Sequence, residues 1–276
     1  MKKINSLQNL HTHTTYCDGV NTPEQIVTAA IEKGFGAIGF SEHSYMHYSK
    51  HIEINMDAEK TKKYKAEIAS LKKKYKDKID IFCGLEFDIY SDIDMAGYDY
   101  LIGSVHYLKV DGEFVGFDES SNTVREVIDT YFDRDGMKYA KAYYQTLAQL
   151  PNYGDFDIIG HFDLITKHSD SKKFFDDRSE EYRGLVIEAA DALRGKIPLF
   201  EVNTGAIARG YRITPYPMMY VIKELKNMGF GVCITSDCHN MDYIDCAFKE
   251  SEELLKACGF KEKYILTKQG FVSVEL

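Results

Sequence analysis

Leu10-His11-Thr12-His13-Thr14-Thr15-Tyr16-Cys17-Asp18 is the stretch on which the interpretation of the whole chain depends. If it leaves a strand, His11 and His13 point to the same side, because side chains in a strand alternate between faces. Two neighbouring imidazoles, followed by the carboxylate of Asp18, are the beginning of a metal site. The simpler alternative is a pair of surface histidines, so the motif needs partners elsewhere in the chain.

The bulk composition is that of a soluble globular protein. The chain has 276 residues, of which 44% are hydrophobic and 28% charged, and it contains no Pro- or Ser-rich linker, so we expect a single domain spanning residues 1–276. The net charge is −9, from 34 basic and 43 acidic residues. No long basic block occurs, so a nucleic-acid partner is not expected. Bound cations could still recruit an anionic substrate.

The cysteines and the apolar segments indicate the compartment. The six cysteines form no Cys-x-x-Cys pair, which favours a reducing environment in a chain of this length. The first residues are slightly basic, but no apolar run follows them, and none elsewhere approaches the length of a membrane span. We therefore expect a cytoplasmic protein without a membrane partner. The sequence does not predict the oligomeric state.

Strand-like and helix-like segments alternate along the chain. Helices are expected at 22–34, where Thr22, Pro23 and Gln25 form a capping box, and at 58–75, 121–150 (broken near 135–136), 179–194, 216–228 and 244–258. Apolar strands are expected at 7–11, 37–40, 80–85, 100–105, 156–160, 197–202 and 231–235, with a hairpin at 107–115 and a last strand near 271–274. This order predicts a parallel sheet covered by helices, closed or nearly closed into an α/β barrel. An open doubly wound sheet is the alternative, although no Gly-rich phosphate loop supports it.

Each of the seven barrel strands leads into a polar side chain. In order these are His11 and His13, His43, Glu86, His106, His161, Glu201 and Asn203, and Asp237 and His239. Because the carboxyl ends of parallel barrel strands meet at one rim, these side chains are expected to converge. Imidazoles and carboxylates together suit zinc, iron or manganese, and their number exceeds one tetrahedral ion. Two or three divalent ions fit better, and clustered ions of this kind promote phosphoryl hydrolysis.

The same segments resemble the successive motifs of the PHP (polymerase and histidinol phosphatase) superfamily. The resemblance is carried by His11-Thr-His13, Glu42-His43, Gly84-Leu-Glu86, Gly103-Ser-Val-His106, Gly160-His-Phe-Asp163 and Thr235-Ser-Asp-Cys-His239. Within the superfamily, Gly160 to Lys167 and Glu201 to Arg209 are similar to the stand-alone histidinol-phosphate phosphatases. The resemblance implies a distorted seven-stranded β/α barrel with a trinuclear metal site.

The resemblance also implies roles for individual residues. Glu86 would bridge two ions, the first completed by His11, His13 and Asp237, and the second by His106 and His161. Asp18, His43 and His239 would hold a third ion, and the carboxylate of Asp18 makes that site harder than histidine would. Lys167 and Arg209 resemble phosphate-binding cations. The residues expected to act in catalysis are Glu86, Asp237, Arg209 and Lys167.

The implied activity is metal-dependent hydrolysis of L-histidinol phosphate to L-histidinol and phosphate in histidine biosynthesis. Another small phosphoester, such as a phosphotyrosine or a nucleotide, is an alternative substrate, and a catalytically silent metal-binding domain is an alternative of another class. The acid that protonates the leaving group and the carboxylate that binds the substrate amine are not identified by the sequence.

Several residues near these motifs are expected to have ordinary roles. His47, His51 and His168 are interpreted as non-ligands, Cys17 and Cys238 as packing residues, and Glu201 as structural. Glu42 is compatible with a hydrogen bond to an imidazole or with a salt bridge elsewhere. Residues 44–57 are interpreted as a loop over the mouth of the site, with Tyr45 and Tyr48 lining it.

Overall fold

The sheet is a seven-stranded, nearly closed parallel barrel. The computed structural model describes residues 5–51 and 56–276. Its strands follow the order β1 (Gln8–Asn9), β2 (Ala37–His43), β3 (Asp80–Asp88), β4 (Tyr100–Ser104), β7 (Ile158–Ile159), β8 (Leu199–Asn203) and β9 (Gly231–Thr235). All neighbouring pairs are parallel. Beyond β1 and β9, a parallel bridge between Thr12 and Cys238 draws the two edges together. The expected barrel is therefore confirmed, and the open sheet is not.

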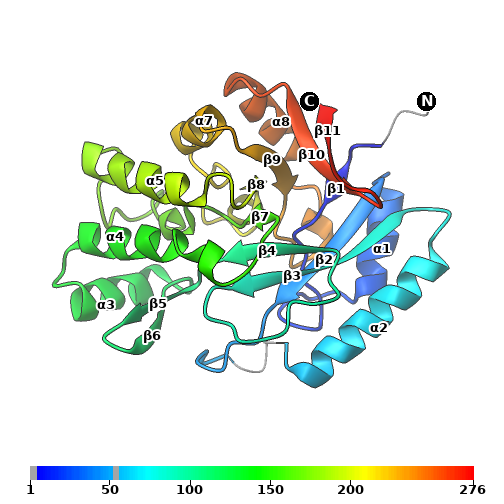
Figure 1. Ribbon diagram of the computed structural model, residues 1–276, viewed down its shortest axis with the longest axis horizontal. Helices are drawn as coiled ribbons and strands as arrows, with labels where there is room; N and C mark the ends of the chain where they lie inside the picture. The colour runs from blue at the N-terminus through cyan, green and yellow to red at the C-terminus, as the bar shows by residue number, and fades with distance from the viewer. Residues whose placement is uncertain (1–4, 52–55) are drawn as a thin grey trace.

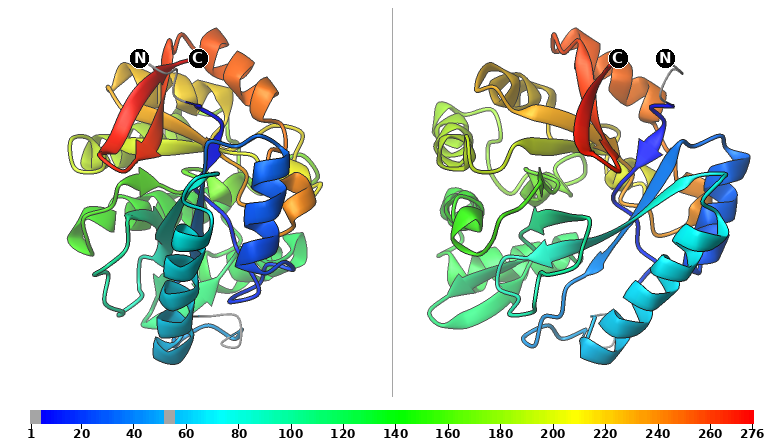
Figure 2. Two further views of the ribbon diagram at one scale, coloured as in Figure 1. Left: turned by 90° about the vertical axis from the view of Figure 1, so that its right-hand side faces the viewer. Right: turned by 45° about the vertical axis from the view of Figure 1, so that its right-hand side comes forward.

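Helices lie on the outside of this sheet (Figures 1 and 2). They are α1 (Pro23–Glu32), α2 (Ala58–Lys74), α3 (Ser121–Tyr131), α4 (Gly136–Leu147), α5 (Glu180–Leu193), α7 (Met219–Asn227) and α8 (Phe248–Ala257). The one-turn helix α6 (Gly205–Ala208) lies instead at the end of β8, directly before Arg209. The helix starts follow local signals. Thr22 and Gln25 form the expected capping box of α1, and the Asp57 side chain caps α2. None of the described helices is both long and apolar enough to cross a lipid bilayer.

The interior of the barrel is filled by a small apolar cluster below the polar rim. Leu10, Phe82, Tyr100, Leu199 and Cys233 belong to it. The Tyr100 ring fits because β2 and β3 carry glycines there: a Cβ on Gly84 would lie 2.3 Å from the Tyr100 Cζ, and one on Gly39 would lie 2.5 Å from its hydroxyl oxygen. Side chains alternate along each strand, so Phe82, Gly84 and Glu86 share the inner face, with Glu86 at the top.

Two hairpins lie outside the barrel. β5 (Tyr107–Val110) and β6 (Glu113–Gly116) are antiparallel and turn at Asp111 and Gly112, which both have positive φ. β10 (Glu262–Thr267) and β11 (Gly270–Glu275) form the second hairpin, and Leu266, Tyr264 and Phe271 pack against the cluster inside the barrel. This hairpin closes the end opposite the polar rim. The sequence predicted its last strand but missed β10.

The expected boundaries differ from the observed ones at several elements. β1 and β7 have two residues each, fewer than predicted. The predicted helix at 216–228 begins only at Met219, because Tyr216 instead exchanges backbone hydrogen bonds with Asn203. The predicted helix at 244–258 begins at Phe248, after the 3₁₀ turn Met241–Tyr243. These differences leave the positions of the strand ends at the rim unchanged.

Candidate metal centre

All nine predicted ligand residues gather at the carboxyl ends of the barrel strands. A cavity of about 280 Å³ opens there, and most of them line it. The nine are His11, His13, Asp18, His43, Glu86, His106, His161, Asp237 and His239. His11 and His13 lie deepest, both fully buried. The convergence expected from the strand ends is thus present in the structure.

Glu86 lies at the centre of the cluster, with imidazoles on both sides of its carboxylate. Oε2 faces the nitrogens of one group, His11 Nε2 at 3.4 Å, His13 Nε2 at 3.5 Å and His43 Nδ1 at 2.8 Å. Oε1 faces the other group, His161 Nε2 at 2.9 Å and His106 Nε2 at 3.4 Å. A carboxylate placed between two groups of imidazoles has the geometry needed to bridge two ions.

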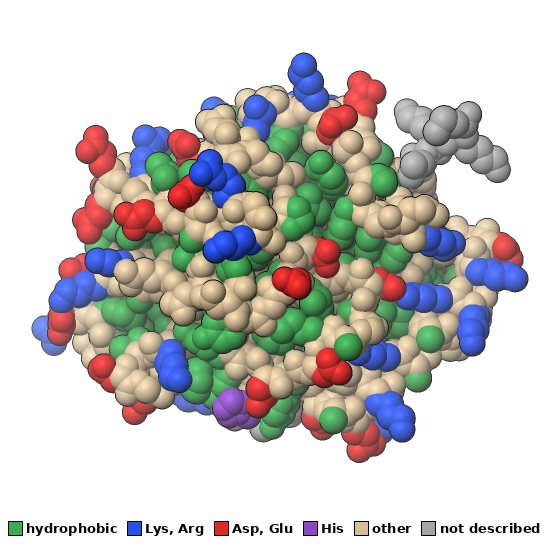
Figure 3. All heavy atoms as spheres, in the orientation of Figure 1, with side chains coloured by type: hydrophobic (Ala, Val, Ile, Leu, Met, Phe, Trp, Pro, Cys, Tyr) green, Lys and Arg blue, Asp and Glu red, His purple; other side chains and the backbone are tan. Residues whose placement is uncertain are grey.

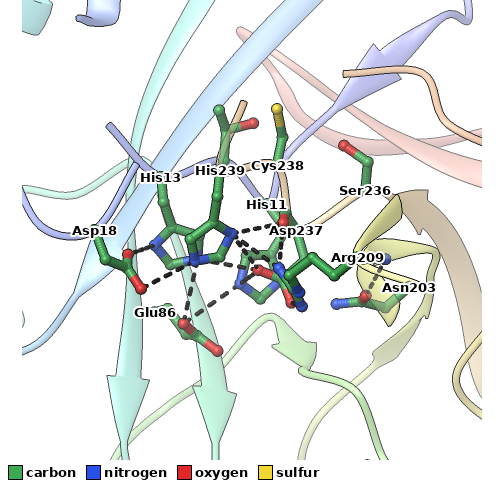
Figure 4. A network of polar contacts seen from close by, with 12 residues as sticks. His11, His13, Asp18, Glu86, Asn203, Arg209, Ser236, Asp237, Cys238 and His239 are labelled. Atoms are coloured by element: carbon green, nitrogen blue, oxygen red, sulfur yellow. Dashed lines mark hydrogen bonds and ion pairs between the residues drawn. The ribbon is translucent and has the colours of Figure 1, made fainter. Parts of the chain in front are cut away.

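Asp237 completes the first group from the end of β9. Its Oδ1 lies 3.3 Å from His13 Nε2 and 3.7 Å from His11 Nε2, and these three residues form one of the sets that could hold an ion. The backbone of Asp237 has φ of 46°, which is uncommon for a residue with a Cβ and occurs at functional sites. This conformation turns the side chain toward the cluster (Figure 4).

A third set lies at the outer side of the cluster. Asp18 Oδ2 is 3.1 Å from His239 Nε2 and 3.5 Å from His43 Nε2, and His13 belongs to the same set. Figure 4 shows the His13 and His239 rings side by side between Asp18 and Asp237; their centroids are 4.3 Å apart. Imidazole and carboxylate ligands combined in this way suit zinc, iron or manganese.

Burial and the neighbouring charges together determine the protonation states in the cluster. Among the described residues, three buried ring nitrogens here form no hydrogen bond: His11 Nε2, His13 Nε2 and His161 Nδ1. Burial lowers the pKa of His13 to about 3, aided by His43 and His239, so its imidazole is neutral. Burial alone would raise the pKa of Glu86, but the surrounding imidazoles hold it well below the usual value. The neighbouring carboxylates raise the pKa of His11, His43 and His106 against the effect of burial, so a divalent ion bound here would take the place of the protons on these rings.

The two predicted phosphate-binding cations line the same cavity. Arg209, at the end of α6, donates to the backbone oxygen and Oδ2 of Asp237 at 3.0 Å each, and its Nη1 lies 2.9 Å from His239 Nδ1. Lys167, after the short 3₁₀ turn Leu164–Thr166, donates to Asp118 Oδ1 at 2.8 Å and to its backbone oxygen at 2.6 Å. Arg209 is therefore attached to the ligand cluster, whereas Lys167 is paired with a carboxylate that the sequence analysis did not single out.

Buried carboxylates hold the far sides of two imidazoles. Glu201 Oε2 lies 2.9 Å from His11 Nδ1, and its Oε1 accepts from the His161 backbone at 2.7 Å. Asp88 Oδ2 lies 3.3 Å from His106 Nδ1 and accepts from its backbone N–H at 2.9 Å. Such contacts fix which nitrogen carries the proton and which faces the cluster. Glu201 is thus a structural residue, as expected, and its role is to orient the imidazole of His11. The sequence feature that could have indicated this role is the position of Glu201, two residues before Asn203 on the inward face of β8.

Cys17 is more than the packing residue that was predicted. Its sulfur lies 3.3 Å from His13 Nδ1 and donates to Glu42 Oε2 at 2.7 Å. Glu42 is buried and also accepts from the backbone N–H and the hydroxyl of Thr14. Burial, then Glu42 and Asp18, raise the pKa of Cys17 well above that of a free thiol, so the sulfur keeps its proton. Glu42 therefore supports an imidazole through the thiol of Cys17, and that imidazole belongs to His13 and not to the adjacent His43.

The remaining histidines and the loop lie around the mouth. His47 contacts the rings of Tyr48 and Phe114, and His168 is buried against Tyr211. His51 lines the cavity and lies 3.5 Å from Glu119. Of the expected loop, Met46, Ser49 and His51 line the cavity, while residues 52–55 lie outside the described residues. The prediction that Tyr45 and Tyr48 line the mouth is wrong, since neither is among the residues that line this cavity. Tyr48 instead stacks on Phe114 and donates to Asp88.

The fold and this cluster define an α/β-barrel protein with a histidine- and carboxylate-rich pocket that could hold several metal ions. The chain belongs to the PHP domain family, whose model matches residues 9–205.

Relatives with assigned names cover nearly the whole chain. It is 26% identical over 270 residues to the probable histidinol-phosphatase of Deinococcus radiodurans, with 93% of this chain and 95% of that protein covered. It is 27% identical over 267 residues to the histidinol-phosphatase of Bacillus subtilis, with 90% and 98% covered. The structure of histidinol phosphate phosphatase from Lactococcus lactis, complexed with zinc, L-histidinol and phosphate, has a TM-score of 0.72 to this chain at 21% identity, with 97% of this chain and 99% of that one covered. That likeness supports the barrel fold.

Proposed function

We propose that this protein is a metal-dependent phosphomonoesterase that hydrolyses L-histidinol phosphate to L-histidinol and phosphate. One observation carries the proposal: nine metal-compatible side chains and two cations line or underlie one cavity in a chain of the PHP family. The substrate is proposed from the relatives, since the curated proteins named histidinol-phosphatase match over nine-tenths of this chain. The reaction belongs to histidine biosynthesis.

The proposed ligand assignment follows the three groups of atoms. Glu86 would bridge two ions, one held also by His11, His13 and Asp237, and the other by His106 and His161. Asp18, His43 and His239 would hold the third. The groups support two or three divalent ions, with zinc, iron and manganese as candidates. Such ions supply Lewis-acid stabilisation of phosphoryl oxygens and a hydrolytic nucleophile at neutral pH.

The side chains around the cluster bind and orient the phosphate. Arg209 is fixed by Asp237 and presents a planar, permanently charged group beside the cluster. Lys167 lines the same cavity and contributes a second positive charge. Positive groups placed before the reaction stabilise the charge that develops on the equatorial phosphoryl oxygens. Glu86 and Asp237, together with these two cations, are the residues to which we assign catalysis.

We propose that the PHP domain extends over the whole chain. The family match ends at residue 205, yet β9, Arg209, Asp237 and His239 belong to the same barrel and cavity. We therefore treat residues 1–276 as one PHP domain.

All six cysteines are free thiols, which agrees with a cytoplasmic location. On the face seen in Figure 3, basic and acidic side chains are interspersed, and with the net charge of −9 this argues against a nucleic-acid partner.

A substrate panel tests the proposal. Protein loaded with each candidate metal is assayed with L-histidinol phosphate, phosphotyrosine and a nucleoside monophosphate. We expect kcat/KM for L-histidinol phosphate to exceed the others by about 100-fold or more, as a site with specific polar contacts allows. A preference for another ester would overturn the substrate and leave the phosphoesterase intact. No turnover with any metal would favour a silent metal-binding domain.

A further inference from the structure

A pair of opposite charges lies inside the cavity beside the candidate metal cluster. Lys167 Nζ donates to both the carboxylate and the backbone oxygen of Asp118. Both residues line the cavity, with side-chain exposures of 11% and 33%. Asp118 follows β6, and the backbone N–H of its neighbour Phe117 lies 3.4 Å from the carbonyl oxygen of His106. The pair is therefore placed next to one of the proposed ligands rather than on the outer surface.

Each member of the pair has capacity for a further partner. An ammonium has three donors; two of those on Lys167 go to Asp118, while the group also lies 4.6 Å above the Tyr211 ring. Among the described residues, Lys167 is the only side chain that forms a hydrogen bond with the Asp118 carboxylate, and it uses one of the two oxygens. The second oxygen remains able to accept from a ligand in the cavity.

A neighbouring carboxylate is less suited to the same task. Glu119 also lines the cavity, but its side chain is 51% exposed and is paired with His51, which is 52% exposed. Ion pairs between exposed groups contribute little because water screens them. Asp118 is more buried, so water screens its attraction for a positive charge in the cavity less strongly.

We propose that Asp118 recognises the ammonium group of the substrate and that Lys167 holds its place in the free enzyme. This inference rests on the proposed function, because L-histidinol phosphate carries an amine close to its phosphate ester. When the substrate enters, its phosphate attracts Lys167 and its ammonium pairs with Asp118. One internal ion pair is replaced by two pairs with the substrate, so neither charge is left uncompensated. A phosphate ester without an amine separates Lys167 from Asp118 and leaves the Asp118 carboxylate without a positively charged partner.

The test compares L-histidinol phosphate with its deaminated analogue, 3-(imidazol-4-yl)propyl phosphate. For the metal-loaded wild-type enzyme we expect kcat/KM to favour the amine-bearing substrate by about tenfold or more, the value of one charge-assisted hydrogen bond. In Asp118→Asn this preference falls to about threefold or less, chiefly through KM. Asp118→Glu, which keeps the charge, restores part of it. Glu119→Gln is the matched control and keeps the preference of the wild type.

The outcomes separate the two proposals. If the wild-type enzyme hydrolyses both esters equally well, or if Asp118→Asn keeps the preference, the amine-recognition role of Asp118 is wrong while the phosphatase assignment stands. If the wild-type enzyme hydrolyses neither ester, both are wrong. Calorimetric binding of L-histidinol and of its deaminated analogue gives a readout that does not depend on turnover, and Asp118→Asn is expected to weaken only the former by about tenfold.

Discussion

Glu201 Oε2 lies 2.9 Å from Nδ1 of His11, and both side chains are completely buried. This contact directs the other ring nitrogen of His11, Nε2, toward Glu86 and Asp237. The same carboxylate accepts hydrogen bonds from Asn203 and Thr235, so it is held in place by neighbouring strands. A rigid carboxylate behind an imidazole fixes the orientation of a ligand before any ion binds.

Glu201→Gln is therefore expected to weaken metal binding. The amide keeps the shape but loses the charge, and its NH₂ group cannot accept from His11. Loss of such a contact typically lowers metal affinity by about 10- to 100-fold, measured here by competition with a chromophoric chelator. Glu188→Gln, on the exposed side of α5, is the control. Unchanged affinity in Glu201→Gln would show that Glu201 only supports the barrel.

Cys17 gives a second test of ligand orientation. Cys17→Ala removes the group that lies between His13 Nδ1 and Glu42, and we expect about a tenfold loss of metal affinity. Cys17→Ser keeps a donor and an acceptor at this position and should retain most of the affinity. Cys246→Ala, at a half-buried cysteine that does not line the cavity, serves as the reference. Equal affinities for the alanine and serine variants would contradict the proposed role of the thiol.

The packing of Tyr100 predicts an effect on stability. In Gly84→Ala the new Cβ would lie 2.3 Å from the Tyr100 Cζ, and overpacking of this kind costs about 1–3 kcal/mol or more of unfolding free energy. Gly184, within α5, has no atom within 4 Å of such a Cβ, so Gly184→Ala should stabilise the protein by about 0.5–1 kcal/mol. Urea unfolding of the two variants checks both signs. A Gly84→Ala variant as stable as the wild type would mean that the barrel interior is less tightly filled.

The barrel and the convergence of the proposed ligand residues could be predicted from the sequence for one physical reason. Parallel strands end at the same rim, so His43, Glu86, His106 and Asp237 could be assigned to one volume without knowledge of any distance. The sequence did not predict the contacts between residues that only the folded chain brings together. Cys17, Asp88 and Asp118 became part of the site only through partners brought close by folding, namely His13, His106 and Lys167. Single residues of this kind carry no periodicity or motif.

The other incorrect predictions concern two very short strands and one strand near the end of the chain. β1 and β7 contribute two residues each, too few for a hydrophobic pattern to define their ends. β10 was missed although Tyr264, Ile265 and Leu266 precede a turn at Gly270. Its role is to cover the closed end of the barrel, which the alternation of strands and helices does not predict.

The central claim is that the tips of separate strands hold metal ions that the hydrolysis of L-histidinol phosphate requires. The most direct test measures this activity and the bound metal in the same preparation, before and after complete removal of metal by a chelator and after return of zinc, manganese or iron. We expect activity to fall by several orders of magnitude, as metal-assisted hydrolysis implies, and to return as two or three ions bind per chain. Hydrolysis that persists in fully metal-free protein would contradict the account.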